Sequence, residues 1–438
     1  MASSRTIIFG ALLALVAVLF QPANQRLRCF GFYRGALENI HGQELKIIPG
    51  TPQCEDVHHH LESNLLFLGC QFDDYSARQR WFPGLAVFTD PSGAGDGGIV
   101  VVDPTTFKST RLTLEGFSGP LVTHGIDILS DPSDSSTLHI FVINELPNPL
   151  HYVSATSTNS SEKKWRVQIE VFTHVLGSAT ATHRRSVRHP LINLPNDIYA
   201  ISPTSFYATN DHHYAEGAMR VVEDLLEQHT APWSNTVHVS FSASAAAEEG
   251  VNVTYALEGI HNNNGLGHGP PSRPDEVLVV DASGGVLHRA RRNGADESIE
   301  LVEAIQLDSS LDNPFWFEDA RASSSPGGAG KDKGAYYLAG LAKAAELPKY
   351  THEGALVPSL VWRVKPVKPI EGVEKKVGKW EKELVFQDDG QVLRSASAAV
   401  VVEIEPESQG KGGGEGRQGW LFVTGFLSEA MVAVRIDL

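Results

Sequence analysis

The chain has 438 residues, of which 42% are apolar, so it can bury a sizeable core and is long enough for one large domain or two ordinary ones. Its 36 Lys and Arg against 52 Asp and Glu give a net charge of −16. No basic patch with interleaved aromatic residues occurs, which argues against nucleic-acid binding, and the acidity suits a cation-binding protein.

The first distinctive segment is the apolar run from Ile7 to Phe20. Its length suits a signal-peptide core and is short for a membrane-spanning helix. Residues 1–24 are therefore predicted to be a signal peptide or an uncleaved signal anchor, the alternative being a buried N-terminal helix. The sequons at Asn159 and Asn252 agree with entry into the secretory pathway. We expect a glycoprotein that is secreted or associated with a membrane through this segment.

Three cysteines occur, Cys29, Cys54 and Cys70. Because Cys29 lies just beyond the apolar run, Cys54 and Cys70 form the one plausible internal bridge. A disulfide scaffold is excluded, and no Cys/His spacing indicates zinc.

Beyond residue 60, short strand-like runs such as Leu138 to Ile143 and Val277 to Val280 alternate with turn residues. This pattern is typical of a sandwich, barrel or propeller, and the number of strands at this length favours a propeller. No clean internal repeat marks the blades. We expect residues 25–438 to form a single all-β domain, with Gly-rich surface-loop insertions at 93–98, 323–334 and 409–419.

One stretch, from Ala215 to Gln228, has the period of a helix. We expect a short amphipathic helix that packs on top of the propeller, the alternative being a substrate lid or a membrane contact. Its apolar residues recur at helical spacing: Ala218, Val221, Val222, Leu225 and Leu226.

Pairs of oxygen-bearing residues recur along the chain, most clearly at Asn196-Asp197. Neighbouring side chains on an extended backbone point to opposite faces, so one pair can serve two cations. Calcium takes six to eight oxygen ligands from carboxylates, amides and carbonyls. The other pairs or motifs are Glu55-Asp56, Asn264-Gly265 and Asp312-Asn313.

Around these pairs the chain resembles the paraoxonase (arylesterase/lactonase) family, from about Glu55 to the end and with long insertions. The strongest block is Asn196-Asp197-Ile198 followed by Phe-Tyr-Ala-Thr-Asn-Asp-His at residues 206–212. The resemblance implies a six-bladed β-propeller with two calcium ions in a central tunnel. The matching pieces in the same order are Glu55-Asp56, His124-Gly125-Ile126, Asn264-Gly265 and Leu311-Asp312-Asn313.

The resemblance also implies two sets of calcium ligands. The deeper, structural ion would be held by Asp56, Asp197 and the backbone carbonyl of Ile126. For Asp312 and Asn313 to share an ion, we expect a turn there, next to Pro314. The residues implied for the catalytic ion are Glu55, Asn196, Asn264, Asp312 and Asn313.

His124 matches the histidine that the family proposes as general base, and a neutral imidazole near pH 7 suits removal of a proton from water. The family's second histidine falls here at Glu145. A carboxylate can orient and strengthen His124, but a histidine-to-histidine proton relay is lost. The family's disulfide between the chain ends also has no counterpart, so calcium should contribute more to stability.

The other histidines carry weaker expectations. His58, His59 and His60 are interpreted as a surface loop. His212 and His213 are placed at the tunnel mouth. His261 and His268, which flank Asn264, are placed within reach of a substrate.

Together these expectations predict a calcium-dependent lactonase or arylesterase acting on a small-molecule lactone or ester. Calcium would polarise the carbonyl and His124 would activate water. One alternative is a gluconolactonase-like sugar lactonase. Another is a calcium-stabilised propeller that binds a ligand without hydrolysis, which the departure at Glu145 favours.

Overall fold

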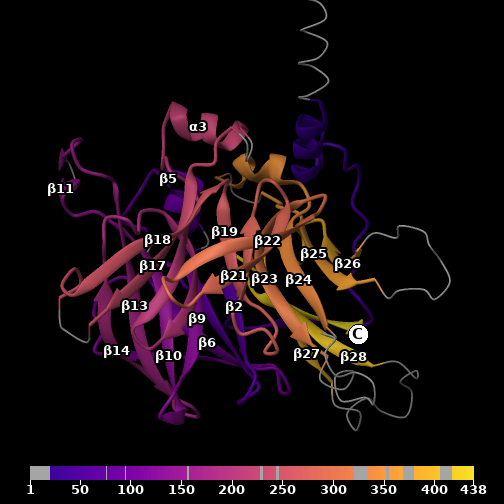
Figure 1. The fold of residues 1–438 in the computed structure, drawn as a ribbon, viewed down its shortest axis with the longest axis horizontal. Coiled ribbons are helices and arrows are strands. Elements are labelled where there is room, and N and C mark those ends of the chain that lie inside the picture. The colour runs from indigo at the N-terminus through magenta and orange to yellow at the C-terminus, as the bar shows by residue number, and fades with distance from the viewer. Residues whose placement is uncertain are drawn as a thin grey trace, which may run out of the picture.

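The computed structural model describes residues 20–438 apart from 75, 94, 155–156, 227–229, 243–245, 320–333, 352–354, 368–378 and 405–416. In this part of the chain, six sheets of four or five strands surround a central axis (Figure 1). The expected six-bladed β-propeller is therefore confirmed. Nearly all of the predicted signal segment, and most of the Gly-rich segments at 323–334 and 409–419, lie outside the described residues. In the third Gly-rich segment, Gly97 and Gly98 already belong to a strand.

Four blades are built from strands that follow one another in the chain, whereas the second blade ends on the earlier strand β8 and the sixth ends on β1. From the inner strand outward, the first blade contains β2 (Asp56–His60), β3 (Leu65–Gln71), β6 (Gly97–Asp103) and β7 (Lys108–Arg111). The second contains β9 (Thr123–Asp131), β10 (Asp134–Pro147), β13 (Trp165–Val175), β14 (Thr180–Val187) and β8 (Thr113–Glu115). The third contains β15 (Pro195–Ser202), β16 (Ser205–Asn210), β17 (Ser234–Phe241) and β18 (Val251–Ile260). The fourth blade contains β19 (Asn263–His268), β20 (Glu276–Asp281), β21 (Val286–Asn293) and β22 (Ser298–Gln306). The fifth contains β23 (Ser310–Glu318), β24 (Gly334–Leu341), β25 (Ser359–Pro366) and β26 (Trp380–Asp388). The sixth contains β27 (Ala396–Glu403), β28 (Gln418–Gly425), β29 (Met431–Asp437) and β1 (Leu45–Ile48).

The inner strands line the axis. Neighbouring inner strands contact one another in the order β2, β9, β15, β19, β23, β27, and β27 contacts β2 again. The polar residues on these six strands are therefore brought together from positions far apart in the sequence.

The hydrophobic core is divided among the interfaces between blades. Six apolar clusters each join two adjacent blades. In strand β3, Leu66 and Leu68 face one neighbouring blade and Phe67 faces the other. Because both faces of the strand are buried, its sequence is a continuous apolar run without polar alternation. Burial of each such side chain contributes about 1.5–3 kcal/mol, so both faces of the strand stabilise the ring.

The ring is closed by strand pairing between the two ends of the chain. Leu45 to Ile48 of β1 pair antiparallel with Val434 to Met431 of β29. The predicted bridge between Cys54 and Cys70 is confirmed, and it lies within the first blade. None of the helices in the described residues is both long and apolar enough to cross a bilayer.

The predicted helix is present. Helix α3 (Ala218–Leu225) lies at the same end of the molecule as the helical residues 20–29 (Figure 1). Val221 is 56% exposed and Leu225 73%, whereas Arg220 and Glu223 are buried. The expected helix on top of the propeller is confirmed, but the side that contacts the propeller is polar, because Arg220 and Glu223 bind backbone groups below the helix.

The contacts below α3 show this. The Glu223 carboxylate accepts the N–H groups of His213 and Tyr214, at 2.9 and 3.0 Å. Arg220 donates to the Gly84 carbonyl at 3.0 Å. The remaining short elements are α2 (Ala77–Arg80), β4 (Trp81–Phe82), η1 (Pro83–Leu85), β5 (Val87–Phe88), β11 (Tyr152–Ser154), β12 (Ser157–Thr158) and η2 (Ala344–Thr351).

Candidate active site in the tunnel

Five of the six inner strands among the described residues carry a β-bulge near the end that faces α3. At each bulge the inner strand has one residue more than the strand that pairs with it, so two inner-strand residues lie opposite one. A bulge re-aims side chains that strict alternation would send to opposite faces. The bulged pairs are His124-Gly125, Asn196-Asp197, Asn264-Gly265, Asp312-Asn313 and Ser397-Ala398.

The bulges revise two expectations. The turn expected at Asp312-Asn313 is a bulge within β23, which lets both side chains approach one point. Asn196 and Asp197 are both buried at the axis. That the two side chains have different partners is therefore due to the bulge, and not only to the alternation of side chains along a strand.

The five residues predicted to hold the catalytic calcium share one property. Each has a buried side-chain oxygen without a hydrogen-bond partner in the described part of the chain. Buried polar atoms are nearly always paired, and leaving one unpaired costs about 1–3 kcal/mol. A common cation would satisfy all five. The atoms are Glu55 Oε2, Asn196 Oδ1, Asn264 Oδ1, Asp312 Oδ1 and Asn313 Oδ1.

Short contacts hold these residues together. The Asn313 amide donates to Glu55 Oε1 at 3.3 Å. A Cβ atom on Gly265 would lie 2.7 Å from the Asn313 Cα and 2.9 Å from the Asp312 carbonyl oxygen. Only glycine therefore lets the Asn264 backbone approach β23 so closely.

Electrostatics also favours a cation here. Burial raises the pKa of Glu55 well above its usual value, and the charges of Asp312 and Asp56 add to this, against His124 and Arg78. Burial raises the pKa of Asp312 in the same way, with contributions from Asp56 and Asp211. Two carboxylates and three amides are hard oxygen ligands that nearly neutralise one calcium ion, so the residues fit the group that the family resemblance implies.

The predicted deeper set lies one level down the tunnel. Asp56 Oδ2 accepts the Ile126 N–H at 3.1 Å, and Asp197 Oδ2 accepts the Leu266 N–H at 2.7 Å. Burial raises the pKa of Asp197 well above its usual value, and the nearby Asp56 carboxylate raises it further. The carboxylates of Asp56 and Asp197 are thus close enough for their charges to repel. That they bind an ion together with the Ile126 carbonyl stays a prediction.

His124 lies beside the upper set. Its Nε2 is 3.2 Å from the Asn196 Nδ2, and its Nδ1 is 3.3 Å from Glu145 Oε1. Because an amide nitrogen only donates, Nε2 accepts and the ring proton sits on Nδ1, toward Glu145. Burial alone would lower the pKa of His124, but the charge of Glu145, assisted by Glu55, raises it.

Sequence reasoning missed a buried arginine at this site. Arg78 donates to the Thr123 carbonyl at 2.8 Å and to the Gln53 carbonyl at 3.2 Å, and its guanidinium lies 4.8 Å from the Phe82 ring centroid. Its positive charge lowers the pKa of both Glu55 and His124. Nothing in its local sequence marked it, because α2 has only four residues.

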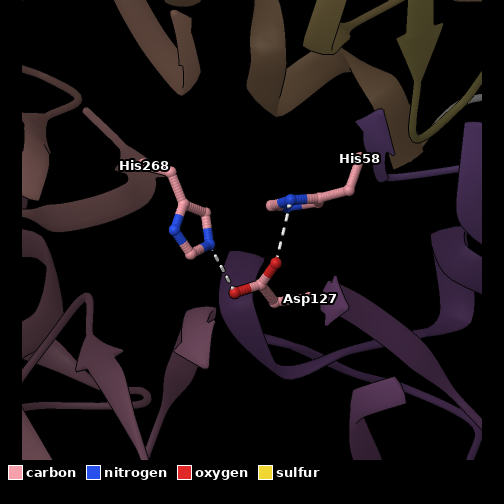
Figure 2. Close-up of side chains that lie close together, drawn as sticks. All are labelled: His58, Asp127 and His268. Carbon is pink, nitrogen blue, oxygen red and sulfur yellow. Dashed lines mark hydrogen bonds and ion pairs between the residues drawn. The ribbon is translucent and has the colours of Figure 1, made fainter. Parts of the chain in front are cut away.

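Three residues form a further polar cluster farther from α3, shown in Figure 2. His58 Nδ1 lies 3.0 Å from Asp127 Oδ1, and His268 Nε2 lies 2.8 Å from Asp127 Oδ2. The interpretation of His58, His59 and His60 as a surface loop was wrong, because all three belong to β2. Strand alternation from the buried Asp56 would have placed His58 on the tunnel side.

The other three histidines for which the sequence predicted a role lie near α3. His212 is buried, with its ring nitrogens 3.0 Å from Asp211 and 2.9 Å from Asp224. His261 is also buried, 3.3 Å from Asp281, and His213 is exposed. The placement of His212 and His213 at the tunnel mouth and the contact of His261 with a substrate stay predictions.

The fold and this site define a six-bladed β-propeller with an oxygen-lined axial tunnel and a histidine–carboxylate pair. The chain belongs to the arylesterase family, whose sequence model matches residues 75–322. His124, Glu145, Asn196, Asn264, Asp312 and Asn313 fall inside this range, while Glu55 and Asp56 precede it.

Several curated proteins are similar to the chain. Human serum paraoxonase/arylesterase 2 is 25% identical over 236 residues, and mouse serum paraoxonase/arylesterase 1 is 30% identical over 237 residues; each alignment covers 53% of this chain and 56% of the relative. Rabbit serum paraoxonase/lactonase 3 is 22% identical over 309 residues, covering 69% of this chain and 75% of the relative. The chain thus spans little more than half the length of the first two.

Proposed function

We propose that the protein is a calcium-dependent hydrolase that opens lactones and cleaves aryl esters. The observation that carries this proposal is that five predicted ligand residues each have a buried side-chain oxygen without a hydrogen-bond partner in the described residues, and that one of them, Asn196, contacts the Nε2 of His124. A calcium ion bound there would polarise the substrate carbonyl and stabilise its developing negative charge. Membership in the arylesterase family supports the same reaction class.

His124 acts as the general base. With its proton on Nδ1, its Nε2 lone pair points toward the Asn196 amide and the ligand oxygens around it. Nε2 removes a proton from water, the resulting hydroxide adds to the carbonyl carbon, and the ring C–O bond of the lactone breaks. His124 then returns the proton to the leaving oxygen, so the product is a hydroxycarboxylic acid, which ionises by releasing its acid proton to water.

Glu145 supports this step as a positioning residue. It is fully buried, and it lies 3.3 Å from the histidine nitrogen opposite the reacting one. Its negative charge stabilises the imidazolium that forms when His124 takes the proton. A carboxylate thereby fills the place of the family's second histidine without a second proton transfer.

The test is a panel of aliphatic lactones, sugar lactones and phenyl acetate, assayed with calcium and after EGTA treatment. We expect turnover of aliphatic lactones that EGTA abolishes, and a loss of about 10²- to 10⁴-fold in kcat for His124→Gln with calcium binding retained. His139→Gln is the matched control, because His139 pairs with a carboxylate, Asp131, at 2.8 Å but lies on β10, away from the site.

Three outcomes separate the alternatives. Preference for sugar lactones would favour a gluconolactonase-like enzyme. Calcium binding without any hydrolysis would favour a propeller that only binds its ligand. Full activity in EGTA would contradict the mechanism.

We also propose that the protein enters the secretory pathway. The apolar segment between Ile7 and Phe20 supports this, as does the exposure of both sequon residues, Asn159 and Asn252. Expression in a eukaryotic secretory host should give a product whose mass falls on treatment with a glycosidase. An unmodified product retained in the cytoplasm would contradict this proposal.

A further inference from the structure

The tunnel continues beyond the two predicted calcium levels. Asp127 and His268 lie three and four residues further along their strands than His124 and Asn264, which is roughly 10–13 Å at about 3.3 Å per residue. His58 lies two residues beyond Asp56 on β2. These three side chains come from three different blades and meet at one point (Figure 2).

We propose that His58, Asp127 and His268 form a third cation site, specific for a divalent transition metal of the zinc class. Two imidazoles and one carboxylate suit zinc and its neighbours in the periodic table, whereas calcium prefers oxygen ligands only. The site is thus chemically distinct from the two oxygen-lined levels above it.

The distances fit such an ion. Ligand atoms bonded to zinc at about 2.0–2.1 Å in a tetrahedral arrangement lie about 3.3 Å from one another. The observed separations from Asp127 are 3.0 Å to His58 and 2.8 Å to His268, and all three ligand atoms lie within 4.8 Å of one another. The two contacts use different oxygens of Asp127, so the most separated ligand atoms would close from at most 4.8 Å to about 3.3 Å around the metal, which would replace the two direct contacts.

The surrounding residues hold the ligands in place. The Asp127 carboxylate accepts the N–H groups of Ile128 and Ala200, at 2.7 and 2.6 Å. His268 stacks on Tyr199, with ring centroids 4.0 Å apart and an angle of 26°. Outer contacts of this kind orient metal ligands and raise their affinity.

His58 also connects the proposed site to the calcium levels. While its Nδ1 faces Asp127, its Nε2 lies 3.2 Å from Asp56 Oδ2. A histidine that binds a metal through one nitrogen commonly donates its other N–H to a carboxylate. Here that carboxylate is a predicted ligand of the deeper calcium.

The site has access to solvent. A cavity of about 1060 Å³ is lined by the three residues together with Tyr199, Trp316 and Trp420. Three protein ligands leave one position of a tetrahedral ion open, which water or a small ligand from this cavity would fill. The His268 side chain is 42% exposed, so the metal has a path to the site.

The test is zinc binding to the full chain by equilibrium dialysis in excess calcium, so that the oxygen-lined levels are already filled. We expect one zinc ion per chain, whose affinity falls by at least about 10- to 100-fold in His58→Gln and in His268→Gln. His59→Gln is the matched control: His59 lines the same cavity, but its ring bonds to Asn64 and not to the cluster. Its zinc affinity should equal that of the wild type.

Cobalt provides a second readout that needs no variant. Co²⁺ bound to the calcium-loaded wild type should show the visible absorption of a tetrahedral ion, and zinc should abolish that absorption. Absence of stoichiometric zinc binding, displacement of zinc by added calcium, or unchanged affinity in His268→Gln would overturn the proposal. The cluster would then be a metal-free hydrogen-bonded array. None of these readouts depends on lactone hydrolysis.

Discussion

At the scale of single residues, the tunnel is defined by carboxyl groups whose charge is disfavoured without a cation. The folded-state pKa of Glu55 is raised well above its ordinary value of 4.5. Between the ordinary pKa of Glu55 in the unfolded chain and its raised pKa in the folded chain, the folded chain binds more protons. Without metal, the contribution of Glu55 to stability therefore falls as pH rises through this range. A bound cation removes this effect because it favours the carboxylate.

This sign gives a prediction for Glu55→Gln. In EGTA, the substitution should stabilise the chain relative to the wild type by an amount that grows as pH rises above about 4.5. In calcium it should instead destabilise the chain, because a ligand is lost. Thermal unfolding of both chains across a pH series, with and without calcium, measures the difference; a difference independent of pH in EGTA would contradict the account.

Glu145 allows a second prediction from a pKa. Its negative charge raises the pKa of His124, and His124 acts as base only when it is neutral. Glu145→Gln should therefore move the acidic limb of the kcat/KM profile to lower pH while reducing the maximal rate. The measurement is a pH–rate profile of both enzymes on one lactone. A limb that stays in place would mean that Glu145 does not act through His124.

At the scale of elements, the β-bulges explain both the success and the limits of the sequence analysis. The pairs Asn196-Asp197 and Asp312-Asn313 could be recognised as sources of ligands because oxygen-bearing residues stood together. Their geometry could not be predicted, because a bulge depends on how two strands pair and not on one strand alone. His58 and Asp127 were not recognised as neighbours because they lie on the inner strands of two adjacent blades, β2 and β9, and a single strand does not show which residues of the next blade it contacts.

Helix α3 shows a tertiary interaction overriding a clear periodic pattern. Its hydrophobic period predicted a helix in the right place, but the buried Glu223 carboxylate binds the backbone amides of His213 and Tyr214 beneath it. Loss of these two hydrogen bonds from the buried Glu223 carboxylate would cost more than the apolar contacts that Val221 gives up. The orientation was therefore decided by groups outside the helix.

Two substitutions in α3 test this account. Glu223→Ala should reduce the free energy of unfolding by about 2–3 kcal/mol, because two hydrogen bonds to a charged group are lost. Val221→Ser should change it by no more than about 0.5 kcal/mol, because the valine is largely exposed. Urea denaturation measures both. The reverse order of effects would show that the helix packs by its apolar side in solution.

At the scale of the whole molecule, six blades were predictable from the family resemblance but not from an internal repeat. The equivalent bulge positions hold His-Gly, Asn-Asp, Asn-Gly, Asp-Asn and Ser-Ala, so the repeat exists in the backbone and not in the residue types. The core also hides the repeat, because each interface between blades accepts any apolar residues that fill it.

Ring closure leads to the prediction at this scale. Since β1 and β29 are joined by strand pairing and side-chain contacts, and the disulfide lies within the first blade, ions bound at the axis should contribute a large part of the stability. Each calcium ion present at 100 times its Kd should add about 2.7 kcal/mol. Scanning calorimetry over a range of calcium concentrations should show Tm rising steadily with the logarithm of the concentration. A constant Tm would show that no ion binds preferentially to the folded chain.

The central claim is that side-chain oxygens from separate blades meet at the axis and bind calcium. Its most direct test is a calcium-binding titration of the wild type beside Asn264→Ala, which removes one of the unpaired oxygens and leaves the carboxylates in place. The account predicts two calcium ions per wild-type chain, and in the variant strong weakening of one ion with the other retained. A wild type that binds no calcium, or a variant with the same two affinities, would contradict it.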